Sequence, residues 1–361
     1  MAREPLSDKS VLRAPRANPE LIGHRRAEEK LLGAWRKGRL GHAWLIHGPR
    51  GLGKATLAYR FARFVLAAGE GGASREGLAI DPESPLFRRI AAGGHTDLLT
   101  LERSPDEKTG ALRDQITVDD ARRVGAFLAL TPGEGGWRVV IVDSADEMNR
   151  NAANALLKHL EEPPERVLFL LVSRRPSRLP ATIVSRCQRL ALRPLGRDEI
   201  TSFLKAKCPK LTDQEAAVLA AMSEGCPGRA LAFAEQGGIA LYKEMLTLLG
   251  TLPDLDIAGL HRLAQRLAAR SAGDEFRALA ELVMGCLARL IRSAASAAPA
   301  SDTPADETAL TGRLIQRDAL AEWVTLWEKL SCLFADAERY KLDRKQVVLN
   351  AFGALQRAAQ H

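Results

Sequence analysis

A glycine-rich loop between an apolar strand and a helix is the feature that most constrains this chain. The apolar run Ala43–His47 leads directly into Gly48-Pro49-Arg50-Gly51-Leu52-Gly53-Lys54-Ala55-Thr56, and a helical pattern continues from Lys54 to Ala67. Glycines at this spacing let backbone N–H groups wrap a phosphate chain, while the helix N-terminus and a lysine add positive charge. The sequence therefore predicts a strand–loop–helix phosphate site, with candidate residues Gly48, Gly51, Gly53, Lys54, Ala55 and Thr56.

Two positions of this phosphate site depart from the pattern of a working nucleotide hydrolase. The Ser or Thr that would hold Mg²⁺ is replaced by Ala55, and Thr56 lies roughly 100° further around the helix. The apolar strand Trp137–Asp143 ends in an acid suited to Mg²⁺, but Ser144 stands where a Glu normally orients the attacking water. We expect weak binding of ATP or ADP, with Mg²⁺ only alongside the nucleotide, and poor hydrolysis. A loop kept only as a turn is the alternative.

Residues 1–195 read as an α/β domain with a mostly parallel sheet covered by helices on both faces. Its five expected strands are Ala43–His47, Asp97–Leu101, Trp137–Asp143, Val167–Ser173 and Gln188–Leu192. Strand patterns then cease: 196–240 reads as a small helical module that includes a capping box at Thr212 and Glu215. Residues 241–361 also read as helical, interrupted by an Ala/Ser/Pro-rich stretch at 293–308 that predicts a flexible loop.

Composition excludes several classes of protein. The 361 residues are 46% hydrophobic and 27% charged, which is enough to bury a normal core. No run of 18 apolar residues predicts a transmembrane helix, and the polar start of the chain does not resemble a secretory signal. Five scattered cysteines form no CxxC pair, and the histidines lack metal-ligand spacing, so we expect neither a metal site nor disulfides. A cytoplasmic location follows as an expectation.

Positive charge is concentrated at the N-terminus. Residues 1–60 hold 13 Lys and Arg against 5 Asp and Glu, whereas the rest of the chain is balanced. Such a segment could meet nucleic-acid phosphates or an acidic protein surface. A solvated face that improves solubility is the simpler interpretation, and the few aromatic residues make a base-stacking platform unexpected.

Several motifs together resemble the bacterial clamp-loader family, the AAA+ proteins of the DNA polymerase III holoenzyme. A long run from Asn151 to Pro164 follows the acidic strand, and Ser185-Arg186-Cys187 comes after the next strand. Further agreement lies in Gly41-His42-Ala43, in Gly94-His95-Thr96-Asp97 and in Gly225-Cys226-Pro227-Gly228-Arg229. The resemblance covers residues 20–235. It implies an AAA+ P-loop domain, a small helical lid and a C-terminal helical collar that oligomerises.

The resemblance also implies roles for particular residues. Arg186 would project into the ATP site of a neighbouring subunit as an arginine finger, Asp143 would be the acid of the metal-binding strand, and Arg229 resembles a lid arginine that senses nucleotide. A surface arginine for Arg186, and local packing for Arg229, are the alternatives. The family often carries a four-cysteine zinc module, but residues 66–116 contain no cysteine, so no zinc is predicted.

Within the family, Ala55 and Ser144 favour the non-hydrolysing delta-prime kind of subunit over the ATP-hydrolysing gamma/tau motor. The implied partners are gamma/tau-type ATPase subunits and a delta subunit, with the sliding clamp and primer-template DNA met through the complex. The main alternative is a gamma/tau-like ATPase that uses Asp146 or Glu147 as its base. A stand-alone DNA-binding protein is a more distant possibility, and nothing resembles a polymerase carboxylate site.

Overall fold

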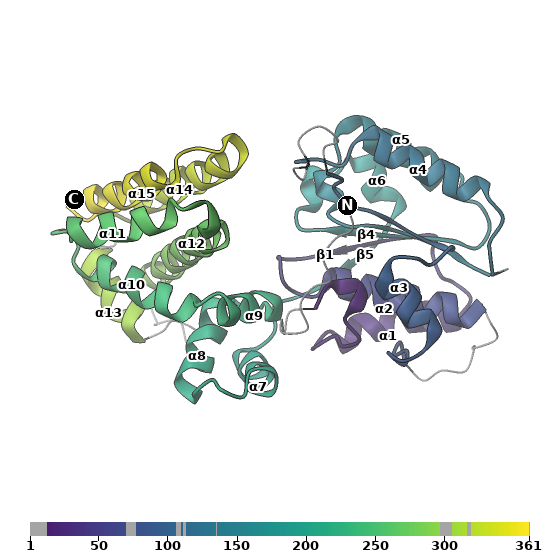
Figure 1. Cartoon of the computed structure of the whole chain (residues 1–361), viewed down its shortest axis with the longest axis horizontal. Helices are drawn as coiled ribbons and strands as arrows, with labels where there is room; N and C mark the ends of the chain where they lie inside the picture. Colours follow the sequence, from purple (N-terminus) through teal and green to yellow (C-terminus); the bar gives the residue numbers. More distant parts are fainter. Residues whose placement is uncertain are drawn as a thin grey trace. The chain divides into compact units, whose positions relative to one another are not determined.

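The computed structural model describes residues 13–69, 77–105, 110, 113–134, 136–296, 305–315 and 319–360, which fall into two compact units (Figure 1). The first unit runs to Leu195 and includes Cys226–Gly228, and the second contains Gly196–Gly225 and the chain from Arg229 onward. The division of the second unit into lid and collar domains stays a prediction from the sequence. Within the described residues, no helix is both long and apolar enough to cross a membrane.

The first unit is built on a five-stranded parallel sheet, as predicted. Its strands are β1 (Ala43–His47), β2 (Leu98–Leu101), β3 (Arg138–Val142), β4 (Val167–Ser173) and β5 (Gln188–Ala191). They lie in the order β2-β3-β4-β1-β5, and every neighbouring pair is parallel. Three strands are shorter than expected, because Asp97, Trp137, Asp143 and Leu192 flank the ladder instead of belonging to it.

In the described part of the first unit, α-helices cover both faces of this sheet (Figure 1). They are α1 (Arg25–Arg36), α2 (Lys54–Gly69), α3 (Pro85–Ala92), α4 (Val118–Ala129), α5 (Arg150–Glu161) and α6 (Ala181–Arg186). Alternate residues of each strand point to opposite faces. Trp44 and Ile46 of β1 therefore pack with α1, α2 and α3, while Leu45 packs with α4, α5 and α6.

In the described residues of the second unit, all of the regular secondary structure is helical. Its α-helices are α7 (Arg197–Lys207), α8 (Asp213–Met222), α9 (Pro227–Glu235), α10 (Gly238–Gly250), α11 (Ile257–Leu267), α12 (Gly273–Ala295), α13 (Ala305–Leu314), α14 (Leu320–Tyr340) and α15 (Arg344–Ala358), α9 beginning within the first unit. The expected capping box opens α8, where Thr212 and Glu215 exchange hydrogen bonds. Helix α12 runs to Ala295 and α13 begins at Ala305, so the loop expected at 293–308 is helical at both ends, and residues 297–304 lie outside the described ranges.

The acid of the Gly94–Asp97 motif has a structural role in the first unit. Asp97 is 3% exposed, and its carboxylate accepts hydrogen bonds from the backbone N–H groups of Gly133 at 2.8 Å and Glu134 at 3.0 Å. A buried carboxylate is tolerated only when such donors replace its water. Asp97 thus fixes the turn that leads into β3.

We predict that Asp97→Ala lowers the free energy of unfolding by about 1–3 kcal/mol, because two hydrogen bonds to a buried, charged acceptor are lost. Urea denaturation followed by circular dichroism measures the change. Asp114→Ala removes an exposed carboxylate of the same unit and serves as the control. Equal effects of the two substitutions would contradict the assigned role of Asp97.

Candidate functional site

The phosphate loop lies between β1 and α2 and has the backbone that its glycines permit. Gly48, Gly51 and Gly53 have φ values of 148°, 84° and 88°, which side chains rarely adopt. A Cβ on Gly48 would lie 2.7 Å from the carbonyl oxygen of Leu192, and one on Gly53 would lie 2.8 Å from Leu21. All three glycines are favoured by their backbone conformation, and at Gly48 the nearby carbonyl oxygen also leaves no room for a side chain.

Lys54 is a buried cation at the start of α2. Its side chain is 6% exposed, and Nζ donates a hydrogen bond of 2.6 Å to the carbonyl oxygen of Pro49 within the loop. Burial, reinforced by the nearby positive charge of Arg174, lowers the pKa of Lys54 to about 8. An ammonium held beside a helix N-terminus fits a phosphate, whose charge would offset the cost of its burial.

The residues on the metal side of the loop fit Mg²⁺ poorly. Ala55 has no oxygen to offer, and Thr56 is buried at 7% exposure. Asp143 follows β3, where burial and then the like charge of Glu102 raise its pKa and so weaken it as an anionic ligand. Among the described residues, no group of three or more His, Cys, Asp or Glu is arranged to bind a metal ion.

Asp146 and Glu147, the candidate bases of the motor alternative, have structural partners instead. Asp146 accepts a 2.9 Å hydrogen bond from the backbone N–H of Arg174. Glu147 pairs with the side chain of Arg174 and, at 3.0 Å, with Nε of Arg103. Both carboxylates hold the segment after β3 in place.

Two contacts hold the phosphate loop from outside. The N–H of Gly228, at the start of α9, donates a 2.8 Å hydrogen bond to the carbonyl oxygen of Gly51. A Cβ on Gly228 would lie 3.0 Å from the same oxygen, which explains glycine at this position of the Gly225–Arg229 motif. The imidazole of His24 donates from Nε2 to the carbonyl oxygen of Leu52 at 3.0 Å. Sequence reasoning did not identify Gly228 or His24 as loop contacts, because both are distant from the loop in the chain.

Arg186 lies at the edge of the sheet where the strands begin, whereas the phosphate loop lies at the opposite edge, where β1 ends. Gln188 of β5 is level with Trp44 of β1 in a parallel pair, so Arg186 is level with the residues that precede β1. The loop begins only after His47, at the other end of β1. At about 3.3 Å per residue the two sites are roughly 20 Å apart along the strands, further than an arginine side chain extends. Any phosphate that Arg186 contacts must therefore belong to a molecule bound elsewhere than in this chain's own loop.

Two acceptors hold the guanidinium of Arg186. Nη2 pairs with Oε1 of Glu161 at 2.8 Å, and Nη1 donates to the carbonyl oxygen of Thr182 at 3.0 Å. The Arg186 side chain is 35% exposed, so its remaining donors can meet another molecule. The adjacent Cys187 is buried, which raises its thiol pKa to about 12 and fits a packing role.

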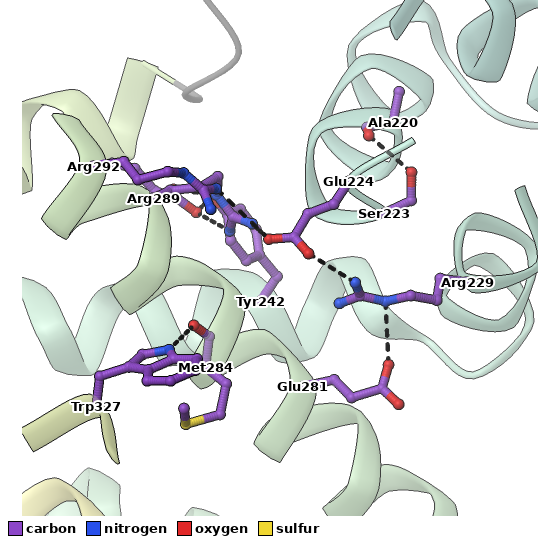
Figure 2. A network of polar contacts seen from close by, with 11 residues as sticks. Ala220, Ser223, Glu224, Arg229, Tyr242, Glu281, Met284, Arg289, Arg292 and Trp327 are labelled. Carbon is purple, nitrogen blue, oxygen red and sulfur yellow. Dashed lines mark hydrogen bonds and ion pairs between the residues drawn. The ribbon is translucent and has the colours of Figure 1, made fainter. Parts of the chain in front are cut away.

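Arg229 is engaged within the second unit (Figure 2). Its Nη1 donates a 3.0 Å hydrogen bond to Glu224, and its Nε is paired with Glu281 of α12 at 3.3 Å. Glu224 has a left-handed backbone, φ 51°, in the turn between α8 and α9, and its carboxylate also lies 3.7 Å from Arg289 and 3.9 Å from Arg292. Arg229 is therefore part of a tie between the α8–α9 turn and α12.

This tie continues into a fully buried ionic cluster (Figure 2). Arg289 of α12 makes two 2.7 Å hydrogen bonds to Glu307 of α13, and the hydroxyl of Tyr242 on α10 donates to the same carboxylate at 2.7 Å. Arg289 is 4% exposed and Glu307 is 0% exposed. A buried pair of this kind stabilises the fold only while both partners are present. No motif in the sequence indicated this cluster, since its three members are distant in the chain.

We predict that Lys54 titrates near pH 8, because burial and the nearby charge of Arg174 disfavour its charged form more than Asp146 and Asp143 favour it. NMR of ¹³C-labelled lysine side chains would show one resonance with this midpoint, and Lys54→Arg would remove it. A midpoint near the ordinary value of about 10.4 would contradict the assignment. Because the charge is lost above about pH 8, affinity for a phosphate should fall as the pH rises through that value.

We also predict that Glu307→Ala destabilises the second unit by about 3–5 kcal/mol, because Arg289 is left buried without its partner. Hydrogen exchange followed by mass spectrometry measures the loss in peptides from α12 and α14. Asp274→Ala breaks the exposed pair with Arg277 and should cost less than about 1 kcal/mol. Replacing Arg289 and Glu307 together by leucine should cost less than Glu307→Ala alone, and the opposite order would contradict this account.

Comparison with known proteins agrees with this architecture. Residues 23–196 match the model of the family described as DNA polymerase III, delta subunit. DNA polymerase III subunit delta' of Pseudomonas aeruginosa is 38% identical over 186 residues, covering 52% of this chain and 53% of that protein. Subunit delta' of Escherichia coli is 35% identical over 206 residues, covering 56% and 58%, and subunit tau of E. coli is 28% identical over 297 residues, covering 76% and 44%.

The chain spans about half the length of these relatives. The matched region holds the phosphate loop, the acid after β3 and Arg186, at both edges of one sheet. Over residues 23–196, which lie in this first unit, the chain is similar to the family described as DNA polymerase III, delta subunit, and delta' subunits are among the proteins that it resembles there.

Proposed function

We propose that this chain is a delta-prime-like subunit of a DNA polymerase III clamp loader, and that it supplies Arg186 to the ATP site of a neighbouring subunit. The observation that supports this most strongly is the position of Arg186, at the edge of the sheet opposite the chain's own phosphate loop. An exposed arginine so far from that loop can act on a nucleotide only across an interface. The delta' relatives support the choice of complex.

The chemical role of Arg186 follows from the nature of phosphoryl transfer. Negative charge spreads over the γ-phosphate oxygens in the transition state, and a planar guanidinium can bind two of them at once. Because Arg186 is held at the end of α6 by Thr182 and Glu161, little of its motion remains to be lost on binding. The chain would accelerate hydrolysis in its neighbour whatever its own weak or absent hydrolysis of ATP.

In its own loop the chain would bind ATP or ADP weakly and hydrolyse it poorly or not at all. Lys54 and the backbone N–H groups of the glycine-rich loop would hold the phosphates. Mg²⁺ would enter only with the nucleotide, because Ala55 offers no hydroxyl and Asp143 has a raised pKa. Ser144 occupies the position of the water-orienting Glu. No zinc is proposed.

Arg229 would act as a structural tie instead of a nucleotide sensor. Its pairs with Glu224 and Glu281 join the α8–α9 turn to α12, so releasing it toward a nucleotide would break both. With both pairs intact, the second unit would keep its internal structure while neighbouring subunits change shape. We propose gamma/tau-type ATPase subunits and a delta subunit as the partners in the cytoplasm, with the sliding clamp and primer-template DNA met through the complex.

A gamma/tau-like ATPase motor is the second candidate, supported by the match to subunit tau over 76% of this chain. Its base would be Asp146 or Glu147. Against it, both carboxylates have arginine partners, and the metal-binding hydroxyl is absent. Turnover of ATP by the isolated chain would favour this candidate.

We predict that Arg186→Ala lowers clamp- and DNA-stimulated ATP hydrolysis of the reconstituted loader at least tenfold, since an arginine finger contributes about 10³–10⁵ in kcat. The isolated chain should be inactive. Arg178→Ala removes an exposed arginine of the same unit and should leave the rate unchanged.

Incorporation of each variant is checked by size-exclusion chromatography, so that loss of assembly is not mistaken for loss of the finger. An unchanged rate in a fully assembled Arg186→Ala loader would contradict the proposed function.

A further inference from the structure

We propose that Glu161 is the residue that positions Arg186 for its action in trans, an inference that rests on the proposed function. Glu161 is the last residue of α5 and precedes β4, whereas Arg186 is the last residue of α6 and precedes β5. Because β4 and β5 flank β1 in a parallel sheet, the residues that precede these strands come to the same edge. The topology thus brings together two residues that are 25 positions apart in the chain.

The end of α5 is itself fixed at this edge. His42 is the residue before β1, and its Nε2 donates a 3.0 Å hydrogen bond to the carbonyl oxygen of Leu160. Leu160 is 1% exposed and anchors the last turn of α5 in the core. The carboxylate of Glu161 is therefore presented from a rigid support and not from a mobile loop.

Glu161 and Thr182 together determine the direction of the guanidinium. Each accepts from a different terminal nitrogen, at 2.8 and 3.0 Å. A guanidinium has five N–H groups, so those left over lie on a planar group whose orientation is already set. An arginine without these contacts would have to lose more side-chain freedom on reaching a phosphate.

Helix stability does not account for an acid at this position. A carboxylate in the last turn of a helix is disfavoured by the negative end of the helix dipole. Glu161 and Glu162 both lie at this unfavourable end of α5, and Glu161 forms the ion pair with Arg186. Glu162 is exposed, and it offers a control of the same charge at the adjacent position.

The size of the expected effect follows from exposure. The side chains of Arg186 and Glu161 are 35% and 45% exposed, and pairs of this kind contribute at most about 1 kcal/mol because water screens them. The same screening limits the repulsion between Glu161 and an incoming phosphate. Loss of an orientation of this strength should lower kcat about two- to fivefold.

The experiment uses the reconstituted loader and measures clamp- and DNA-stimulated ATP hydrolysis as a function of ATP concentration. Glu161→Ala should lower kcat about two- to fivefold with KM for ATP unchanged, because the finger acts in the transition state. Glu161→Gln, which keeps an oxygen acceptor, should recover part of the loss. Glu162→Ala should match the wild-type chain.

A double-mutant cycle separates positioning from a general effect on folding. In the Arg186→Ala background, Glu161→Ala should have no further effect, since the group that it positions is gone. An equal loss in both backgrounds would overturn the proposal, and so would equal rates for Glu161→Ala and Glu162→Ala. A rise in kcat for Glu161→Ala would also overturn it, by showing that the carboxylate competes with phosphate for the guanidinium.

The outcomes distinguish this proposal from the one on which it rests. If Arg186→Ala lowers the rate of ATP hydrolysis strongly and Glu161→Ala keeps the wild-type rate, the arginine finger stands and only the role of Glu161 is removed. If Arg186→Ala leaves the rate of ATP hydrolysis unchanged, both the arginine finger and the role of Glu161 are removed.

Discussion

The polarity of the parallel sheet is the constraint on which the rest of this structure depends. All strands run in one direction, so whatever follows a strand lies at one edge and whatever precedes a strand lies at the other. The phosphate loop and Asp143 follow β1 and β3, and His42, Glu161 and Arg186 precede β1, β4 and β5. One sheet therefore carries the candidate phosphate loop at one edge and the partly exposed Arg186 at the other. If two such domains lay side by side, the edge of one that carries Arg186 could meet the edge of the next that carries the phosphate loop.

Much of the first unit could be predicted from sequence because its signals are local. Apolar runs bounded by turn residues identified all five strands, and the glycine spacing predicted the loop that joins β1 to α2. The capping box at Thr117 and Asp120 could also have located the start of α4. The sequence alone could not show that Arg186 and Glu161 form a pair, or that Gly228 reaches Gly51, since these contacts depend on the order of the strands and on long-range packing.

The second unit shows the limit of local signals more clearly. Helical periodicity predicted its class, but the cluster of Tyr242, Arg289 and Glu307 depends on three helices meeting. The same holds for Arg229, for which the sequence left sensing and local pairing equally open, whereas its pairs with Glu224 and Glu281 require the packing of α12 beside the α8–α9 turn. Buried charges in such a place are costly unless paired, so arrangements of these helices that separate the partners would be disfavoured.

The central claim is that Arg186 acts on a nucleotide bound by another subunit. A structure of the assembled loader, bound to clamp, primed DNA and ADP with beryllium fluoride, tests it most directly. We expect the Arg186 guanidinium to lie within hydrogen-bond distance, about 3 Å, of the fluoride group in the neighbouring site. An Arg186 that points into solvent in that complex, or toward a phosphate in the loop of its own chain, would contradict it.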